Sequence, residues 1–216
     1  MMSESGGGLL IIGAGGHAKV VLAAARLEKR FECFAILDED SANWGTCVQG
    51  TEVVGGCDLL TRLNSDEWHA VIAVGDNETR RRFAQQATQI GWRFACIFHP
   101  RAHIGEDVGI GEGTVILPQA VVNESSRIGR HVIVNSGAIV EHDCIIADYA
   151  HLAPGCCLTG RCEVGELAMI GARAAVLPGV RVGASAVVGA GAVVTHDVGV
   201  AEVVVGVPAR PLRTSP

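Results

Sequence analysis

The sequence predicts two domains of different fold, a small α/β domain over residues 1–98 and a parallel β-helix over residues 99–216. Two observations predict this division. From residue 104 onward an aliphatic residue recurs at every sixth position, whereas residues 9–97 alternate strand-like apolar runs with helix-like segments. A six-residue period fits neither a helix of 3.6 residues per turn nor a long two-residue alternation, and it is typical of a parallel β-helix.

The hexapeptide period runs without interruption from Ile104 to Val194 and contains sixteen aliphatic residues in succession. Two residues before most of them stands a small or short side chain, such as Ala138, Cys144 or Ala150. Each hexapeptide predicts one short strand and one tight turn, so three of them close a coil of about eighteen residues. The aliphatic and small side chains are expected to point inward and to stack from coil to coil. The 28 glycines are expected to supply the turns.

The first domain has a different pattern, in which apolar runs alternate with segments rich in helix-forming residues. The predicted elements are a strand over 9–12, a helix over 18–30, strands over 34–37 and 71–74, a helix over 78–90 and a strand over 94–97. This alternation predicts a small parallel sheet, a Rossmann-like unit of half the usual size. His99-Pro100 marks the junction with the β-helix, because a proline disfavours continued regular structure.

A glycine-rich loop follows the first predicted strand. Gly13, Gly15 and Ala18 fit the pattern G-x-G-x-x-A between a strand and a helix, where backbone N–H groups can bind phosphate. Asp38 ends the second predicted strand, where an acidic residue would accept a hydrogen bond from a ribose hydroxyl. A domain of this size supplies one mononucleotide half, so a dinucleotide is not expected. A tight turn that merely needs glycines remains the alternative, and His17 either faces a ligand or serves only the loop.

Composition limits the classes of partner. A formal net charge of −6 without a basic stripe argues against nucleic-acid binding. Residues 1–8 are short, polar and glycine-rich and do not resemble a signal peptide, and no apolar run is long enough to span a membrane. Several of the eight cysteines, among them Cys144, Cys156 and Cys162, occupy inward positions of the repeat. We interpret them as reduced core thiols of a cytoplasmic protein.

Two histidines in the middle of the repeat are candidate site residues. His142 and His151 lie off the inward positions, so the outer wall of the β-helix is expected to display them. Nine residues separate them, which is half a coil, so a site that uses both needs a second subunit. His142 has carboxylates on both sides, Glu141 and Asp143. A carboxylate partner orients an imidazole and raises its basicity, as a general base requires, although surface histidines without a catalytic role are common.

Five segments carry a resemblance to a known family over almost the whole chain. They are residues 13–21 (GAGGHAKVV), 36–38 (ILD), 73–80 (AVGDNETR), 135–144 (NSGAIVEHDC) and 205–210 (VGVPAR). In this order, with the hexapeptide repeat between them, they resemble the bacterial nucleotide-amino-sugar N-acetyltransferases. These belong to the left-handed β-helix, or hexapeptide-repeat, superfamily, together with sialic-acid O-acetyltransferase-like proteins.

The resemblance implies left-handed coils and a homotrimer whose active sites lie between subunits, with acetyl-CoA bound between neighbouring β-helices and no metal. It implies that His142 is the general base and that Asp143 supports it. The residues implied to contact acetyl-CoA are His151, Gly171, Ala172, Gly189 and Ala190. Those implied to hold the nucleotide sugar are Gly15, Gly16, His17, Asp38, Glu39 and Gly75. Several relatives carry two aspartates where this chain has Asp38-Glu39, so its hold on the base or ribose is expected to differ.

These observations lead to the hypothesis of an acetyl-CoA-dependent N-acetyltransferase for bacterial surface glycan synthesis. It would act on the amino group of a nucleotide-linked 4-amino-4,6-dideoxy sugar by direct transfer, because no G-x-S-x-G motif indicates an acyl-enzyme. One alternative is an O-acetyltransferase acting on a sialic acid or a similar hydroxyl. Another is a zinc-binding β-helix like the carbonic anhydrases, for which His142 and His151 are too few ligands. A purely structural binding module is the third. The sequence does not identify the nucleotide.

Overall fold

The computed structural model describes residues 7–63 and 67–212, and the chain divides into two compact units, Met1–Pro100 and Arg101–Pro216. The predicted boundary followed residue 98. Of residues 1–8, for which the sequence predicts no signal peptide, residues 1–6 lie outside the described residues. The two α-helices of the described ranges have 13 residues each, and neither is long and apolar enough to cross a membrane.

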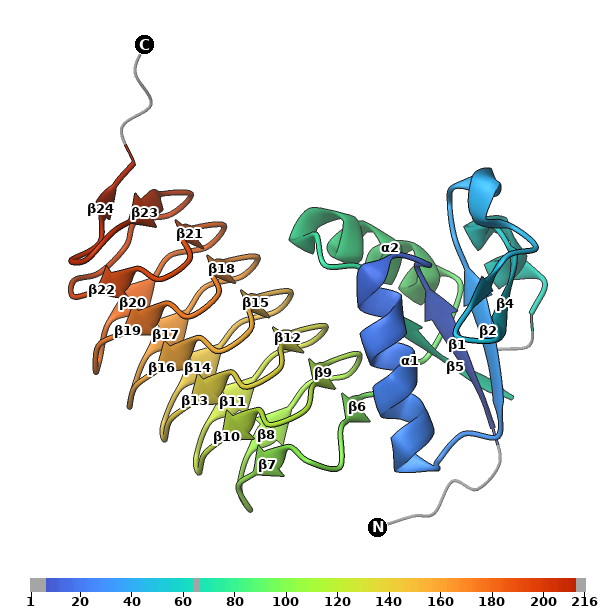
Figure 1. Ribbon diagram of the computed structural model, residues 1–216, viewed down its shortest axis with the longest axis horizontal. Helices are drawn as coiled ribbons and strands as arrows, with labels where there is room; N and C mark the ends of the chain where they lie inside the picture. Colours follow the sequence, from blue (N-terminus) through green and yellow to red (C-terminus); the bar gives the residue numbers. More distant parts are fainter. Residues whose placement is uncertain (1–6, 64–66, 213–216) are drawn as a thin grey trace. The chain divides into compact units, whose positions relative to one another are not determined.

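The first unit is a small α/β fold around one sheet (Figure 1). Its elements are β1 (Gly8–Ile12), α1 (Gly16–Glu28), β2 (Cys33–Leu37), the 3-10 helix η1 (Ser41–Asn43), β3 (Cys47–Val48), β4 (Thr51–Gly55), the 3-10 helix η2 (Cys57–Thr61), β5 (Trp68–Ile72), α2 (Asn77–Gln89) and β6 (Ile97–Phe98). All five residues of β1 are buried, as a continuous apolar run at the centre of a parallel sheet should be.

The sheet order is β3-β4-β2-β1-β5, and β1 pairs in parallel with both β2 and β5. The chain therefore leaves β1 on one side to build β2 and β4, and later returns to add β5 on the other side. The loops after these parallel strands lie at one edge of the sheet, with the topological switch point at β1. Ligands of open α/β sheets bind at this kind of edge.

Several predicted boundaries in this unit were wrong. The strand predicted over 71–74 is Trp68–Ile72, and strands β3 and β4 were not predicted. The run predicted as a strand over 94–97 contributes only an isolated bridge between Phe94 and Ala70, and the strand is Ile97–Phe98. Both helices begin one or two residues earlier than predicted, because the residue that ends each preceding loop already joins the first turn.

The second unit is the left-handed parallel β-helix of hexapeptide repeats, as predicted. Each of the sixteen predicted aliphatic residues is the second residue of a two-residue strand. The first sheet holds β7 (His103–Ile104), β10 (Val121–Val122), β13 (Ile139–Val140), β16 (Cys157–Leu158), β19 (Ala175–Val176) and β22 (Val193–Val194). The second holds β8 (Gly109–Ile110), β11 (Arg127–Ile128), β14 (Ile145–Ile146), β17 (Glu163–Val164) and β20 (Arg181–Val182). To the third, the second unit contributes β9 (Val115–Ile116), β12 (Ile133–Val134), β15 (His151–Leu152), β18 (Met169–Ile170), β21 (Val187–Val188), β23 (Val203–Val205) and β24 (Arg210–Pro211).

Residues that are eighteen apart lie beside one another in this unit, as in the register Val121↔Ile139↔Cys157. Figure 1 shows the coils stacked from β7 to β24. From Ile116 to Val194 every aliphatic of the period is at most 4% exposed, so the inward stack forms a continuous core. This close packing leaves only outward strand residues and turn residues for chemistry.

The turns differ from the prediction that glycine supplies them. From Gly113 to Gly191, every sixth residue has a left-handed backbone with φ between 53° and 73°, yet only five of these fourteen corner residues are glycine. The others include Asp143 and Leu167. An L-residue in this region costs about 1–2 kcal/mol. The strands that pair on both sides of each corner hold the backbone in this conformation.

Candidate active site

Four glycines follow strands β1 and β5, at the edge of the sheet where the parallel strands end. They are of two kinds. Gly13 is required by the fold, because its φ is +108° and an added Cβ would lie 2.9 Å from Val74. At Gly15, Gly16 and Gly75 an added Cβ would meet nothing within 4 Å, and no left-handed φ constrains them. Packing therefore does not explain these three glycines. The missing side chains leave the backbone open to close approach by a ligand.

The N-terminus of α1 is suited to an anion. Gly15 is its N-cap and provides no side-chain hydrogen bond, and the first turn contains no acidic residue. The Ala18 N–H already donates to the Gly15 carbonyl oxygen at 3.1 Å, but neither a capping side chain nor a carboxylate of the first turn occupies this helix start, and the helix dipole favours negative charge there. His17 lies half-buried in this first turn.

Asp38 connects the glycine loop to the end of β2. Its Oδ2 accepts from the Ala14 N–H at 2.6 Å, and its Oδ1 accepts from the Asp40 N–H at 2.9 Å and from the Asn43 Nδ2 at 3.1 Å. A carboxylate offers about four acceptor sites, so one acceptor site remains for a ribose hydroxyl. In this structure Asp38 also fixes the shape of the glycine-rich loop after β1.

Glu39 lies beside Asp38 and is paired with Arg82 of α2. Both guanidinium Nη atoms donate to its carboxylate at 2.8 Å, and both side chains are about half exposed.

Cys57 follows β4 and lies near the Glu39 and Asp38 carboxylates. Burial, reinforced by the nearby Glu39 and Asp38 carboxylates, raises the pKa of the Cys57 thiol to about 11. Cys57 is therefore a neutral thiol at physiological pH.

The buried side chain of Arg80 stabilises the loop after β5. Arg80 is 1% exposed, and its Nη1 donates to the carbonyl oxygens of Val74 at 3.0 Å and Gly75 at 3.1 Å. Its Nη2 donates to Asn77 Oδ1 at 2.7 Å. The sequence indicated only a charged start to this helix. The buried guanidinium instead fixes the backbone that carries Gly75.

His142 and Asp143 form a pair on the outer wall of the β-helix, at the corner after β13. Nδ1 of His142 lies 2.7 Å from Asp143 Oδ2, and both side chains are 53% exposed. A carboxylate accepts only, so Nδ1 carries the proton in this contact and Nε2 of the neutral ring is left with a lone pair that can accept a proton. The left-handed backbone at Asp143, with φ of 59°, is part of the corner that sets this geometry.

The His142 ring lies against Gly160, one coil further on. A Cβ at Gly160 would lie 2.7 Å from both Cε1 and Nε2 of the imidazole. The Gly160 N–H has no hydrogen-bond partner within the described part of the chain. Gly160 was not among the residues predicted from the sequence, although it lies eighteen residues, one full coil, after His142.

His151 is the outward residue of β15, and Asn135 lies beside it. Asn135 Nδ2 is 3.2 Å from His151 Nε2. Since an amide nitrogen only donates, Nε2 accepts here and the neutral ring carries its proton on Nδ1. Asn135 belongs to one of the five segments that resemble the family, but no role was predicted for it. Its amide fixes the orientation and tautomer of a residue predicted to contact acetyl-CoA.

The other residues predicted to contact acetyl-CoA follow the third sheet on the next two coils. Gly171 and Ala172 come directly after β18, and Gly189 and Ala190 come after β21. Gly171 must be glycine, because a Cβ would lie 2.6 Å from the Ala190 nitrogen. Together with His151 of β15, these residues line one sheet and the corner that follows it.

The predicted residues thus form three groups. The nucleotide-sugar residues Gly15, Gly16, His17, Asp38, Glu39 and Gly75 gather at one edge of the first unit's sheet. His142 and Asp143 occupy the corner after β13 of the first β-helix sheet, whereas the residues predicted to bind acetyl-CoA follow the third. Within one chain His142 and His151 therefore belong to different sides of the coil, as their spacing predicted.

All eight cysteines are free thiols, and the three at inward positions are fully buried. The neighbouring Cys162 thiol and burial raise the pKa of the Cys144 thiol, which donates to the Thr159 carbonyl oxygen at 3.3 Å. Cys144 is therefore not a nucleophile.

Over residues 7–63 and 67–212, no three side chains of His, Cys, Asp or Glu gather so that they could hold a metal ion.

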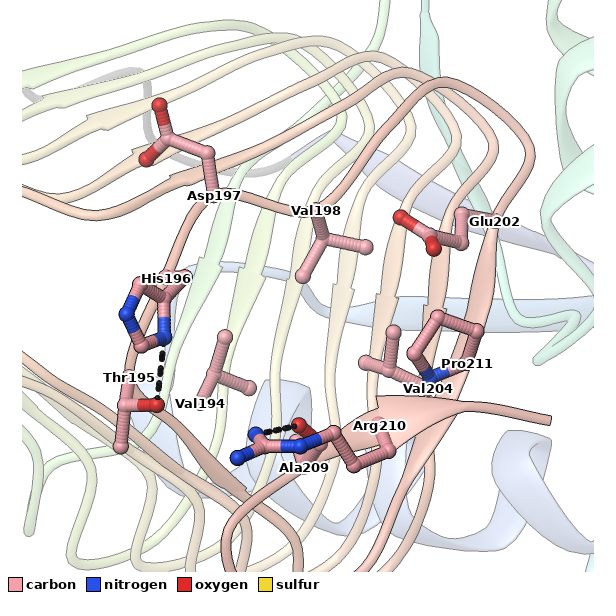
Figure 2. Close-up of a pocket in the computed structure, with 10 residues that line it drawn as sticks. All are labelled: Val194, Thr195, His196, Asp197, Val198, Glu202, Val204, Ala209, Arg210 and Pro211. Carbon is pink, nitrogen blue, oxygen red and sulfur yellow. Dashed lines mark hydrogen bonds between the residues drawn. The ribbon is translucent and has the colours of Figure 1, made fainter.

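A pocket of about 250 Å³ lies at the last coil (Figure 2). His196 and Thr195 form one wall, with Nδ1 of His196 2.9 Å from the Thr195 hydroxyl. Arg210 and Glu202 contribute charge from the C-terminal segment. None of the predicted site residues lines this pocket.

The chain matches known proteins over both units. Residues 8–87 match the family described as PglD N-terminal domain, and residues 125–160 and 161–196 match the bacterial transferase hexapeptide (six repeats) family. A Bacillus subtilis (strain 168) protein named UDP-N-acetylbacillosamine N-acetyltransferase is 38% identical over 113 residues. That match spans 50% of this chain and 50% of that protein.

Solved structures match over a larger share of the chain. The perosamine N-acetyltransferase from Caulobacter crescentus, solved as a histidine-to-asparagine variant with CoA and GDP-perosamine, is 37% identical, with a TM-score of 0.91 over 96% of this chain and 98% of that one. The acetyltransferase domain of PglB from Neisseria gonorrhoeae FA1090, solved with acetyl coenzyme A, is 35% identical, with a TM-score of 0.91 over 96% of this chain and 100% of that one. On this evidence, the chain belongs to the nucleotide-amino-sugar N-acetyltransferase family of the hexapeptide-repeat superfamily.

Proposed function

We propose that the chain transfers the acetyl group of acetyl-CoA to the amino group of a nucleotide-linked 4-amino-4,6-dideoxy sugar, a step in bacterial surface glycan synthesis. The observation that carries the proposal is the exposed His142–Asp143 pair, an imidazole whose Nδ1 is held by a carboxylate. The three open glycines and the uncapped start of α1 supply the second requirement, a place for the nucleotide phosphates. The relatives solved with CoA, acetyl-CoA or GDP-perosamine support both substrate classes.

The proposed reaction is direct transfer within a ternary complex. The sugar amine attacks the thioester carbonyl carbon, and Nε2 of His142 takes a proton from the amine as the C–N bond forms. The tetrahedral intermediate collapses, the C–S bond breaks, and the coenzyme leaves as a thiolate that regains a proton. The Gly160 N–H, beside the His142 ring, is suited to stabilise the developing oxyanion.

The proposal includes a homotrimer with active sites between subunits. Its support is that His142 and His151 lie on different sides of one chain's β-helix. A neighbouring chain would bring its own His151 beside His142. It also includes a cytoplasmic location, because acetyl-CoA and nucleotide sugars are made and consumed there.

A thiol-release assay with acetyl-CoA tests the function. The acceptors are UDP-, GDP- and dTDP-linked 4-amino-4,6-dideoxy sugars, because the relatives' names and complexes include both UDP and GDP compounds. A sialic acid is the hydroxyl control. Rapid release with one amino sugar is expected, and it identifies the nucleotide. Release with sialic acid alone would favour O-acetylation and contradict the proposal.

The role of His142 is tested in the same assay. His142→Ala is expected to lower turnover by about two to four orders of magnitude, the usual contribution of a general base. His103→Ala is the matched control, because His103 is an exposed outward residue of β7 outside all three predicted groups. A His142→Ala variant within about tenfold of wild type would remove His142 from the mechanism.

A further inference from the structure

An exposed tryptophan lies at the same edge of the first unit's sheet as the glycine loop. Trp44 follows η1 and is 47% exposed. Its indole N–H donates to the Asp38 carbonyl oxygen at 2.8 Å, just after β2. The adjacent part of the same ring edge contacts Gly56, just after β4, where a Cβ would lie 2.8 Å from Trp44 Cζ2. The indole is therefore held along one edge, while the residue stays about half exposed.

The other two tryptophans are used differently. Trp92 is 4% exposed and donates its indole N–H to the Leu60 carbonyl oxygen, so it belongs to the core. Trp68 begins β5 at the opposite edge of the sheet, and its ring packs where a Cβ of Gly8 would be. Only Trp44 combines a held indole with an open surface near the proposed ligand site. A rigid, exposed indole of this kind provides a stacking surface.

The order of the strands indicates what would stack there. Along the edge the order is β5, β1, β2, β4. The glycine-rich loop proposed to hold the phosphates follows β1, and Asp38, the acidic residue proposed to reach a ribose, follows β2. A nucleotide that continues in the same direction puts its base beside the end of β4. Trp44 spans the ends of β2 and β4 at this point.

We infer that Trp44 is the surface on which the nucleobase of the nucleotide sugar stacks. The inference rests on the proposed function, since it requires the nucleotide to lie along this edge. Stacking is tolerant of base identity, because every base has a π-face. Trp44 therefore contributes affinity for the nucleoside, while the polar groups around it discriminate between bases.

The test measures binding of UDP, GDP, dTDP and inorganic pyrophosphate to the full chain by titration calorimetry, together with tryptophan fluorescence. Trp44→Phe and Trp44→Leu form a matched pair, because both lose the indole N–H and both keep an apolar contact with Gly56, but only phenylalanine keeps an aromatic face. Trp44→Phe is expected to bind the preferred nucleotide within about threefold of wild type, and Trp44→Leu about tenfold more weakly or worse. Pyrophosphate affinity should be the same in all three proteins. The nucleotide should quench wild-type fluorescence and should leave the Trp44→Phe signal unchanged.

Trp68→Phe is the control for the other edge and should retain both affinity and quenching. Thermal unfolding and acetyl-CoA binding of each variant check that the fold is intact. If nucleotides bind wild type and Trp44→Leu equally well, the inference is overturned and the proposed function stands. If no nucleotide binds wild type at millimolar concentration, both the inference and the nucleotide part of the proposed function fail.

Discussion

A methyl group added at Gly160 tests whether the position of the His142 ring controls turnover. The new Cβ would lie 2.7 Å from Cε1 and Nε2 of the imidazole, about 1 Å inside the ordinary contact distance between carbon atoms. The ring is 53% exposed and can move outward, so the free energy of unfolding should fall by less than about 1 kcal/mol. Displacing a catalytic group by about 1 Å can cost about 100-fold in rate. We therefore expect Gly160→Ala to lower kcat about 100-fold with little change in Tm.

The matched control is the same substitution at Gly179, a corner residue of the next coil whose N–H donates to the Gly160 carbonyl oxygen. Gly179 has a φ of +73°, and its Cβ would meet nothing within 4 Å. Gly179→Ala should therefore cost about 1 kcal/mol through backbone strain and lower Tm by about 2–4 °C, with kcat close to wild type. Thiol release with acetyl-CoA and the preferred amino sugar gives kcat, and a thermal melt gives Tm. The reasoning is refuted if Gly160→Ala retains wild-type kcat, or if kcat and Tm fall in parallel in both variants.

Three further predictions concern single side chains. Ser185→Gly should raise stability by about 0.5 kcal/mol in a thermal melt, because exposed Ser185 holds a φ of +56° that glycine adopts freely; a lower Tm would contradict this. Glu28 accepts from the Phe98 N–H, and burial raises the pKa of its carboxyl above the ordinary 4.5. Above that pH the carboxyl ionises more readily in the unfolded chain than in the folded protein, so the free energy of unfolding falls. Glu28→Gln keeps the acceptor and should be more stable than wild type by up to about 1 kcal/mol at pH 7, with the difference gone below about pH 4; a constant difference across this range would count against the pKa shift. Arg80→Lys cannot keep the contacts of the guanidinium with Val74, Gly75 and Asn77 together. The KM for the nucleotide sugar should therefore rise about tenfold while the KM for acetyl-CoA stays constant. Equal rises in both KM values would indicate general unfolding.

The β-helix could be predicted almost residue by residue because its determinants are local and repeated. The residue inside each strand must be aliphatic, since it packs on identical positions one coil above and below, as Val122, Val140 and Leu158 do. The corners could not be predicted in the same way. Leu167 adopts a left-handed backbone because the paired strands on either side impose it, and nothing in the identity of a leucine indicates this, whereas an aspartate such as Asp143 is more easily accommodated there.

The first unit was less predictable because its elements depend on partners distant in sequence. The run Val71–Val74 is more apolar than Trp68–Ala70, yet β5 begins at Trp68 because β1 pairs with it from Gly8 onward. The contacts that shape the site are also long-range. The bond from Ala14 to Asp38 spans 24 residues, and the Arg82–Glu39 ion pair spans 43. Motif spacing indicated which residues gather at the sheet edge, but not that Asp38 and Glu39 already have protein partners.

The regularity of the β-helix restricts where catalytic groups can be placed. In each hexapeptide the core occupies two positions and the left-handed corner fixes a third, which leaves three free to vary: the outward strand residue, the residue after the strand and the residue before the corner. His151 is the outward strand residue of its repeat, and His142 is the residue before the corner. His142 follows the first β-helix sheet and His151 belongs to the third, so within a single chain the proposed base and the predicted cofactor contact cannot meet. A rotationally symmetric assembly brings one side of each chain against another side of its neighbour, and this is the simplest arrangement that joins the two positions into one site.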